Sequence, residues 1–327
     1  MVKKDILPYL RQKILNGEII LDQKKEKIKT FSYYSNAYLN SKKFLKDSTI
    51  RRYFICVERF DKFFGNIEID NIKTSDVKNY LYNLNIKSLT FRNYLYILRD
   101  IFNEALIDEV ITSNPCLKIK IPKNNDKLEI QPFSADEVNL ILSNTSGFLK
   151  NFLATAFYSG CRTGELFALK WQNVDFKRNL IYIDATRGDY KEGSPKTGKN
   201  RYVPIFKSLV PYLQEQYKIT GFKTYVFLTE NGNLLRGTNI LRYYWYPLLK
   251  RINLPKRVLY NTRHTFATNM INSQLFTLNQ IASWLGHSNI RMLVTTYNKY
   301  IDSELQKYDT NIDIFSPKNC NIILKMA

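Results

Sequence analysis

The stretch Ser159-Gly-Cys-Arg-Thr-Gly-Glu165 joins two helical patterns in the second half of the chain. The first pattern, the mostly apolar run 148–158, ends at Gly160, because glycine readily takes the left-handed conformation that closes a helix. A second helix is expected to begin near Glu165, which places Arg162 in the turn between the two. Backbone N–H groups at a helix start and a guanidinium fork can bind one phosphate together. Arg162 is therefore a candidate anion ligand, with a solvated surface arginine as the alternative.

The residues on either side of this turn predict a mainly helical domain with a small antiparallel β-sheet. Ser134-Ala-Asp-Glu137 has the spacing of a capping box, and it opens a helix through Leu142. The runs 180–183 and 201–205 are strand-like and lie on either side of a turn-rich loop, so they predict the sheet. Further helices are expected at 209–217, 240–252, 262–271, 278–284 and 290–300, and 225–228 is one more candidate strand.

The first half of the chain carries its own helical patterns, and 327 residues are comfortable for two domains. Four helices are expected within residues 31–112, with Ser48, Thr74 and Ser88 as N-caps before apolar-periodic runs. Residues 1–30 are expected to form a basic arm with a short helix at 5–15, and residues 113–133 a basic linker interrupted by prolines. Residues 134–300 then form the second domain, and residues 301–327 form a tail.

The charge balance points to a polyanionic partner. Lys and Arg number 49 against 29 Asp and Glu, which gives a net charge of +20. Residues 1–130 hold 24 bases and 16 acids, and residues 131–327 hold 25 and 13, so both halves are basic. A clamp around a nucleic-acid duplex needs positive charge on both lobes. Compositional drift toward lysine is the alternative explanation.

Several classes of protein are excluded by composition. The four cysteines are too widely spaced for a disulfide framework, and no apolar run is long enough to cross a membrane. With no secretion signal, the chain is expected to be cytoplasmic. It has two histidines, no P-loop and no cluster of acidic residues at metal-ligand spacing, so no metal and no cofactor are expected.

Four further blocks hold residues that can carry chemistry. Lys196 lies in the loop between the two expected strands, where Lys199 and Arg201 compete for any role assigned to it. The block Tyr260-Asn-Thr-Arg263-His264 opens a helix, and it is followed by Trp284-Leu-Gly-His287 and then Thr295-Thr-Tyr297-Asn-Lys-Tyr300. Both histidines of the chain fall in these short blocks.

In this order and spacing, the blocks resemble the tyrosine recombinase (phage integrase) family over about residues 31–300. The resemblance implies a helical core-binding domain that clamps DNA and an α+β catalytic domain. It identifies Arg162 and Arg263 with the family's two arginine boxes, Lys196 with its hairpin lysine, His287 with its third-box histidine and Tyr297 with its nucleophile. Tyr300 is the alternative nucleophile, and Glu165 is expected to support Arg162.

One position departs from the family pattern. The family usually has a histidine three residues before the second arginine, and here that residue is Tyr260. His264, directly after Arg263, matches a histidine that is common in the family but lies outside its usual catalytic set. The general base therefore stays open, with Asn261 and His264 as groups that can compensate through water.

The chemistry of these residues fits displacement at a DNA phosphorus. Two guanidinium groups, Arg162 and Arg263, can hold the nonbridging oxygens as charge builds on them. A tyrosine phenol has a pKa of about 10 and needs a base or a cationic field before Tyr297 can attack. Lys196 can protonate the departing 5′-hydroxyl, and His287 can hydrogen-bond the phosphate or the tyrosine. The product is a 3′-phosphotyrosyl link, formed without a metal.

The resemblance also implies partners and a biological role. Double-stranded DNA is the expected substrate, bound by a homotetramer that assembles on it in the cytoplasm at the nucleoid, with an accessory DNA-bending or directionality factor and a tail that docks on a neighbouring protomer. The residues expected to contact DNA outside the catalytic centre are Lys118, Lys120, Lys123, Lys199 and Arg201. An integrase of a mobile element is the first interpretation. A Xer-like chromosome-dimer resolvase, a type IB topoisomerase and a catalytically inactive DNA-binding regulator are the alternatives.

Overall fold

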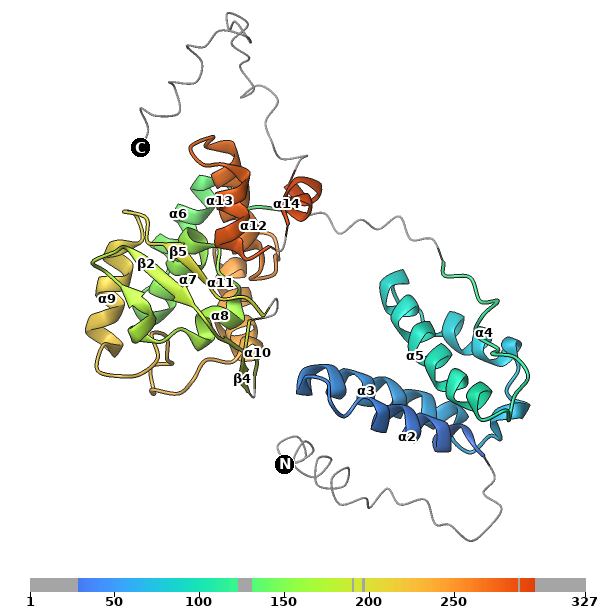
Figure 1. Cartoon of the computed structure of the whole chain (residues 1–327). Helices are drawn as coiled ribbons and strands as arrows, with labels where there is room; N and C mark the ends of the chain where they lie inside the picture. Colours follow the sequence, from blue (N-terminus) through green and yellow to red (C-terminus); the bar gives the residue numbers. More distant parts are fainter. Residues whose placement is uncertain (1–28, 123–130, 190, 196–197, 288, 298–327) are drawn as a thin grey trace, which may run out of the picture. The chain divides into compact units, whose positions relative to one another are not determined.

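The computed structural model describes residues 29–122, 131–189, 191–195, 198–287 and 289–297. The chain divides into two compact units, residues 1–128 and residues 129–327. The expected helix at 5–15, the linker lysines Lys123 and Lys127, and the C-terminal tail lie outside the described residues. Figure 1 shows the elements of each unit, α2 to α5 in the first and α6 to α14 with the strands in the second.

The first unit is a bundle of helices around an aromatic core. Its helices are α2 (Phe31–Ser41), α3 (Asp47–Phe64), α4 (Thr74–Asn83) and α5 (Ser88–Ile107), with a 3-10 turn at Ile69–Asn71. Phe31, Phe60, Phe64 and Phe102 are fully buried at its centre, and the Phe31 ring meets the Phe102 ring edge-on at 5.9 Å. The four helices expected from the periodicity are therefore present within the described residues.

The expected N-caps of this unit are wrong. Helix α3 begins one residue before Ser48, α4 begins at Thr74 and α5 begins at Ser88. All three residues therefore lie inside the first turn of a helix and do not precede it. In α4, the carboxylate of Asp76 accepts the backbone N–H of Lys73 (2.9 Å), so a side chain from within the helix closes its start. The Ser88 hydroxyl instead donates to the carbonyl of Pro122 (2.7 Å), which fastens the end of the linker to α5.

The second unit contains a three-stranded antiparallel sheet in the order β1–β2–β5. The strands are β1 (Val174–Asp175), β2 (Leu180–Ile183) and β5 (Arg201–Pro204), with Ile181 paired to Val203 and Ile183 to Arg201. The loop between β2 and β5 carries a two-stranded hairpin, β3 (Thr186–Arg187) and β4 (Glu192–Gly193). Both expected strands and their antiparallel pairing are confirmed.

The candidate strand at 225–228 is wrong. Tyr225 forms only an isolated bridge with Lys170, and no ladder continues from it. The carbonyl of Val226 accepts hydrogen bonds from the side chains of Gln216 (2.8 Å) and Thr220 (2.7 Å) of α9. The N–H of Val226 donates to Leu169 O (2.9 Å), so the segment is held by single backbone bridges and by side chains of α9.

Helices make up the rest of the second unit: α6 (Ala135–Ser143), α7 (Gly147–Ser159), α8 (Thr163–Ala168), α9 (Val210–Thr220), α10 (Gly237–Asn239), α11 (Tyr246–Arg251), α12 (Asn261–Asn272), α13 (Leu278–Leu285) and α14 (Ile290–Tyr297). The capping box of α6 is confirmed, since Ser134 and Glu137 bond reciprocally at 2.9 and 3.1 Å. The expected helix 240–252 is interrupted by a π-helical turn at Ile240–Trp245. Pro247 has no N–H to donate, so the bonding pattern loosens just before it.

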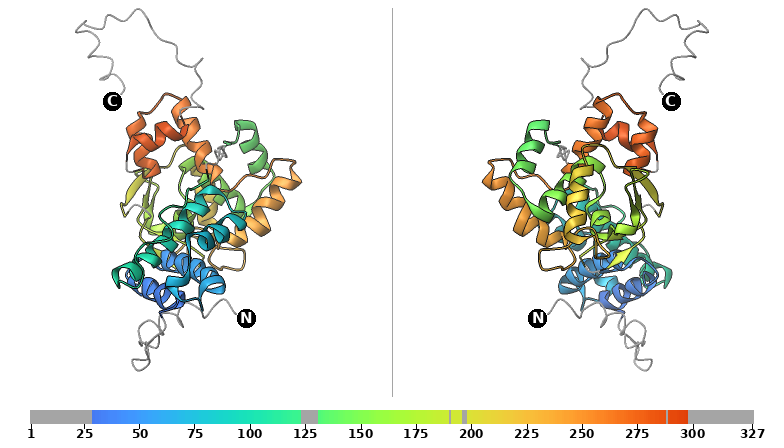
Figure 2. Two further views of the ribbon diagram at one scale, coloured as in Figure 1. Left: turned by 90° about the vertical axis from the view of Figure 1, so that its right-hand side faces the viewer. Right: turned by 90° about the vertical axis from the view of Figure 1, so that its left-hand side faces the viewer.

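Two apolar clusters hold this unit together. The larger surrounds α7 and the sheet, with Phe152, Ile181 and Trp245 fully buried. The smaller joins α12, α13 and α14 through Phe266, Leu285 and other side chains. Figure 2 shows the sheet on one side of the unit and α6 on the opposite side. Cys56, Cys116 and Cys161 are buried free thiols, and no helix among the described residues is long and apolar enough to cross a membrane.

Candidate active site

The turn between α7 and α8 places Arg162 at the start of a helix. Gly160 ends α7 with φ of 61°, and a Cβ there would collide with the ring of Phe266, so this position requires glycine. The carboxylate of Glu165 accepts both the backbone N–H (2.8 Å) and a guanidinium N–H (2.9 Å) of Arg162. This bond starts α8 at Thr163, slightly earlier than the sequence pattern indicated.

Arg201 completes a buried cluster with Glu165. Its guanidinium donates to both carboxylate oxygens of Glu165, at 2.9 and 2.6 Å, and Arg201 is 8% exposed. Burial acts to raise the pKa of Glu165, but the hydrogen bonds and charges of Arg201 and Arg162 hold it below its ordinary value. One ionised carboxylate therefore serves two arginines.

Three arginines bind three consecutive carbonyl groups at the end of α13. Arg201 Nε donates to Trp284 O (2.6 Å), Arg263 Nη2 to Leu285 O (2.5 Å) and Arg162 Nη2 to Gly286 O (3.3 Å). The last carbonyls of a helix have no partner within the helix and carry the negative end of its dipole. The three cations thus fix the backbone immediately before His287.

Arg263 is a buried cation without an anionic partner. It is 1% exposed, and it donates to Gly160 O (2.9 Å) as well as to Leu285 O. Among the described residues, no carboxylate pairs with it. Burial and the nearby charge of Arg162 push the pKa of Arg263 below its ordinary value. Burying an uncompensated charge is unfavourable, so an anion that reaches this guanidinium is bound strongly.

His264 contacts Tyr297 directly. The imidazole Nδ1 lies 2.7 Å from the phenolic Oη, which joins α12 to α14. Tyr297 is 2% exposed, and burial raises the pKa of its phenol. Burial and the charge of Arg263 lower the pKa of His264 to about 4, so the imidazole is neutral at pH 7. Tyr260 is 40% exposed, and its ring meets the His264 ring edge-on at 5.0 Å.

His287 is a second neutral imidazole beside the arginines. Burial, followed by the charges of Arg263, Arg162 and Arg201, lowers its pKa to about 4. Its buried Nδ1 has no hydrogen-bond partner among the residues that the structure describes. The structure therefore brings together Arg162, Glu165, Arg263 and His287, and it places Tyr297 within electrostatic reach of Arg263. Lys196 and Tyr300 lie outside the described residues.

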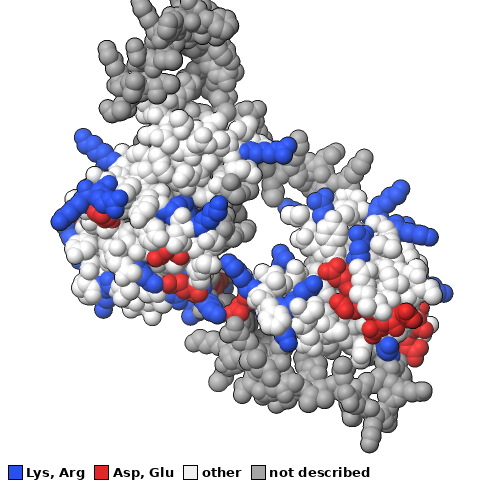
Figure 3. Space-filling model, in the orientation of Figure 1, with Lys and Arg blue, Asp and Glu red and all other residues white. Residues whose placement is uncertain are grey.

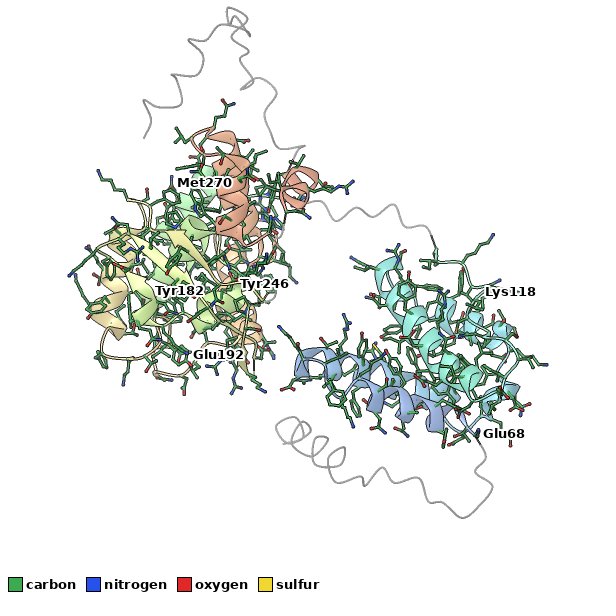
Figure 4. All side chains as sticks on the ribbon, viewed as in Figure 1. Glu68, Lys118, Tyr182, Glu192, Tyr246 and Met270 are labelled. Atoms are coloured by element: carbon green, nitrogen blue, oxygen red, sulfur yellow. The ribbon has the colours of Figure 1, made fainter. Side chains whose placement is uncertain are left out.

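The residues expected to contact DNA have three different placements. Lys118, Lys120 and Lys199 are exposed, whereas Lys123 lies outside the described residues. Lys118 lies at the edge of the first unit (Figure 4), and basic side chains are spread over both units on the face seen in Figure 3. Arg201 is buried and bound to Glu165, so the expectation that it contacts DNA is replaced by a role inside the protein.

A basic groove in the first unit was not anticipated from the sequence. It encloses about 550 Å³ between α3 and α5, and its lining includes Arg51, Arg52, Arg59, Asn93 and Tyr94. Arg59 donates to the hydroxyl of Tyr94 (2.6 Å), which fixes one wall. The sequence feature that indicates this groove is a set of arginines on the more exposed face of α3, a helix with strong apolar periodicity. Among the described residues, no group of three or more His, Cys, Asp or Glu side chains is arranged to hold a metal ion.

Comparison with known proteins identifies relatives along most of the chain. Residues 131–304 match the phage integrase family, and residues 29–121 match the phage integrase SAM-like domain. A tyrosine recombinase XerC-like protein of Caldanaerobacter subterraneus subsp. tengcongensis is 30% identical over 287 residues, covering 75% of this chain and 73% of that protein. The prophage integrase IntR of Escherichia coli (strain K12) is 28% identical over 282 residues, covering 72% and 67%.

Two solved structures share the fold. The Tn1549 transposon integrase in complex with a circular intermediate DNA superimposes with a TM-score of 0.72 at 20% identity, covering 82% of this chain and 95% of that one. The lambda integrase tetramer bound to a Holliday junction gives a TM-score of 0.67 at 18% identity, covering 86% and 87%. At these identities the superpositions establish the fold alone.

Proposed function

This chain belongs to the phage integrase family of tyrosine recombinases, which cleave and rejoin DNA strands, and we propose that it does so with Tyr297 as the nucleophile. The chain is a site-specific DNA recombinase. The observation that supports the residue assignment is a cluster of three arginines: Arg162 and Arg201 share the single carboxylate of Glu165, and Arg263 beside them donates to Gly160 O with no carboxylate partner among the described residues. The surplus positive charge, partly buried and fixed by carbonyl groups, is suited to a phosphodiester.

The arginines bind the scissile phosphate in this proposal. Arg263 has guanidinium donors fixed by Gly160 and Leu285, and Arg162 is held by Glu165 with its side chain 18% exposed. Planar guanidinium groups match the oxygens of a phosphate, and their charge offsets the charge that develops in the transition state. These hydrogen bonds hold both guanidinium groups in place before the DNA binds.

The reaction exchanges one phosphate ester for another. The Oη of Tyr297 forms a bond to phosphorus as the bond to the 5′-oxygen breaks, which leaves a 3′-phosphotyrosyl link. Lys196 donates a proton to the departing 5′-oxygen, and neutral His287 hydrogen-bonds the phosphate. Attack of another 5′-hydroxyl on the link reverses these steps and rejoins the strands. No metal and no cofactor take part.

Binding to the duplex outside the centre uses the basic surface of both units. Lys118, Lys120, Lys123 and Lys199 are assigned to the phosphate backbone, together with arginines of the groove between α3 and α5. Backbone contacts of this kind position the protein and make its affinity dependent on salt. Lys118 and Lys120 support this assignment because both are exposed.

A solved relative supports the proposed assembly. The lambda integrase, which shares the fold, is a tetramer on a Holliday junction, and we extend a DNA-assembled homotetramer to this chain. In the same proposal, residues 301–327 dock on a neighbouring protomer. An accessory DNA-bending or directionality factor and a site of action at the nucleoid in the cytoplasm complete it.

The biological role is integration or excision of a mobile element. A prophage integrase and a transposon integrase among the similar proteins support this role. A Xer-like chromosome-dimer resolvase is the second candidate, because a XerC-like protein is 30% identical to this chain. The DNA that flanks the gene separates them: element-end repeats favour the first, and a housekeeping context favours the second.

A trapped-intermediate assay tests the nucleophile. The substrate is a nicked half-site, selected from random duplexes by binding to this protein, whose cleaved strand releases a short fragment and prevents religation. Wild-type protein should accumulate a covalent protein–DNA adduct, and Tyr297→Phe should form none. Tyr300→Phe is the matched control and should form the adduct normally. Adduct formation by Tyr297→Phe at the wild-type level would overturn the assignment.

A further inference from the structure

The group that removes the phenolic proton is the missing part of this mechanism. Among the described residues, the hydrogen-bond partner of the Tyr297 Oη is Nδ1 of His264, at 2.7 Å. Arg263 is close enough to Tyr297 to affect its pKa, but a guanidinium group has no hydrogen-bond acceptor and cannot take the proton. The apolar cluster that contains Tyr297 includes Phe266, Ile281 and Leu293, and the phenol of Tyr260 acts on Tyr297 through its charge interaction. His264 is thus the group in position to receive the proton.

We propose that His264 is a catalytic residue of this recombinase, the general base that takes the proton of Tyr297 as its Oη attacks phosphorus. This inference rests on the proposed role of Tyr297. In the step, the Oη–H bond breaks, Nδ1 of His264 gains the proton, and the Oη electron pair forms the bond to phosphorus. On rejoining, His264 returns the proton to Oη as the phosphotyrosyl bond breaks.

The geometry of α12 suits this role. Arg263 and His264 are adjacent, so their side chains leave the helix about 100° apart. Arg263 reaches the carbonyls of Gly160 and Leu285, whereas His264 faces α14. One rigid helix therefore carries both a phosphate ligand and the base. The ring of Tyr260, one turn earlier, lies edge-on against the imidazole and restricts its orientation.

The electrostatic setting supports the direction of transfer. The charged and titratable groups that face His264 are Arg263 on its own helix, the neutral His287 beyond α13, and the phenols of Tyr260 and Tyr297. In the free protein, burial and Arg263 keep the pKa of His264 at about 4, so the imidazole is neutral, and the tautomer with its proton on Nε2 leaves Nδ1 able to accept. The negative charge of a bound phosphodiester offsets Arg263. That charge grows in the transition state, which favours the protonated imidazole as transfer occurs.

Substitution by asparagine separates proton transfer from positioning. The Oδ1 of His264→Asn can occupy the place of Nδ1 and accept a hydrogen bond from Tyr297, but it cannot take the proton. His264→Ala removes both functions. Removing a general base slows a reaction by about a hundredfold or more, so both variants should form the adduct at least about a hundredfold more slowly than wild type.

The experiment measures single-turnover adduct formation at saturating protein on two half-sites. One carries an ordinary scissile phosphodiester, and the other carries sulfur in place of the 5′-bridging oxygen. A thiolate departs without a general acid, so Lys196→Ala should recover on the sulfur substrate, whereas both His264 variants should stay slow. Thermal unfolding and DNA binding of each variant verify that it is folded.

Each outcome decides the inference. Slow adduct formation by both variants on both substrates supports a general base. Rates within threefold of wild type, recovery of the variants on the sulfur substrate, or a slow His264→Ala beside a normal His264→Asn would each overturn it. Failure of the proposed function is distinguishable, because Tyr297→Phe would then form the adduct.

Discussion

Arg201 on β5 and Glu165 on α8 form a two-bonded ion pair, with their side chains 6% and 0% exposed. The pair ties the strand that follows the Lys196 loop to the helix that begins beside Arg162. Glu165 also binds and orients Arg162. Arg201 also donates to the carbonyl of Trp284 and so holds the end of α13. Arg201 therefore acts through other residues and is a positioning residue.

Removal of Arg201 should destabilise the second unit. Breaking one partner of a buried ion pair leaves the other charge unpaired, at about 3 to 5 kcal/mol. Arg201→Gln should lower the free energy of unfolding by this amount in urea denaturation and slow adduct formation. Lys199→Gln, a nearby exposed position, is the control and should stay within about 0.5 kcal/mol of wild type. A loss below 1 kcal/mol for Arg201→Gln would refute the positioning role.

A second prediction concerns Gly160, where the backbone has positive φ and no space for a Cβ. Gly160→Ala should displace the Phe266 ring and disturb the carbonyl that Arg263 binds, so both stability and adduct formation should fall. Gly147 is a matched control, because it also has positive φ, at 53°, but nothing lies near its added Cβ. Gly147→Ala should show only backbone strain, about 1 kcal/mol, with normal adduct formation. Equal effects of the two changes on both measurements would contradict this account of the turn.

The pH dependence of the reaction should reflect the two neutral histidines. Burial and the nearby arginines lower the pKa of His264 and of His287 to about 4, so neither gains a proton in the free protein until the pH approaches that value. The groups facing them are Arg162, Arg201, Arg263 and the phenols of Tyr260 and Tyr297. Because kcat/KM reports the free enzyme, adduct formation at subsaturating protein should stay level from pH 8 to about pH 5.5. An inflection near pH 6.5, the ordinary histidine value, would argue against these environments.

Some elements of the fold could be predicted from local sequence patterns, whereas the site could be predicted only in part. The strands β2 and β5 and the capping box of α6 are set by neighbouring residues, so the sequence predicted them correctly. The N-cap prediction failed at α4 because Asp76 closes that helix from inside. The Arg201–Glu165 pair and the contact of His264 with Tyr297 join residues 36 and 33 positions apart, and such contacts depend on how elements pack. Spacing alone cannot reveal them.

The exposed lysines at the start of the linker should contribute to salt-dependent binding. Each phosphate contact that is lost should reduce the slope of log affinity against log salt by about 0.9. The double change Lys118→Gln and Lys120→Gln should therefore reduce the slope by about 2 in a fluorescence-anisotropy titration. Lys218, which pairs with Glu215 at 2.9 Å, is the control, and Lys218→Gln should leave the slope unchanged. A double variant with the wild-type slope would remove these lysines from the DNA interface.

In the proposed reaction, Tyr297 becomes covalently joined to the 3′-phosphate of DNA. Trypsin separates the two candidate tyrosines, because it cleaves after Arg291, Lys299 and Lys307. The trapped adduct should be digested with trypsin and nuclease and then sequenced by mass spectrometry. The account predicts a nucleotide remnant on Tyr297 in the peptide 292–299. A remnant on Tyr300 in the peptide 300–307, or on neither peptide of an adduct that forms, would contradict it.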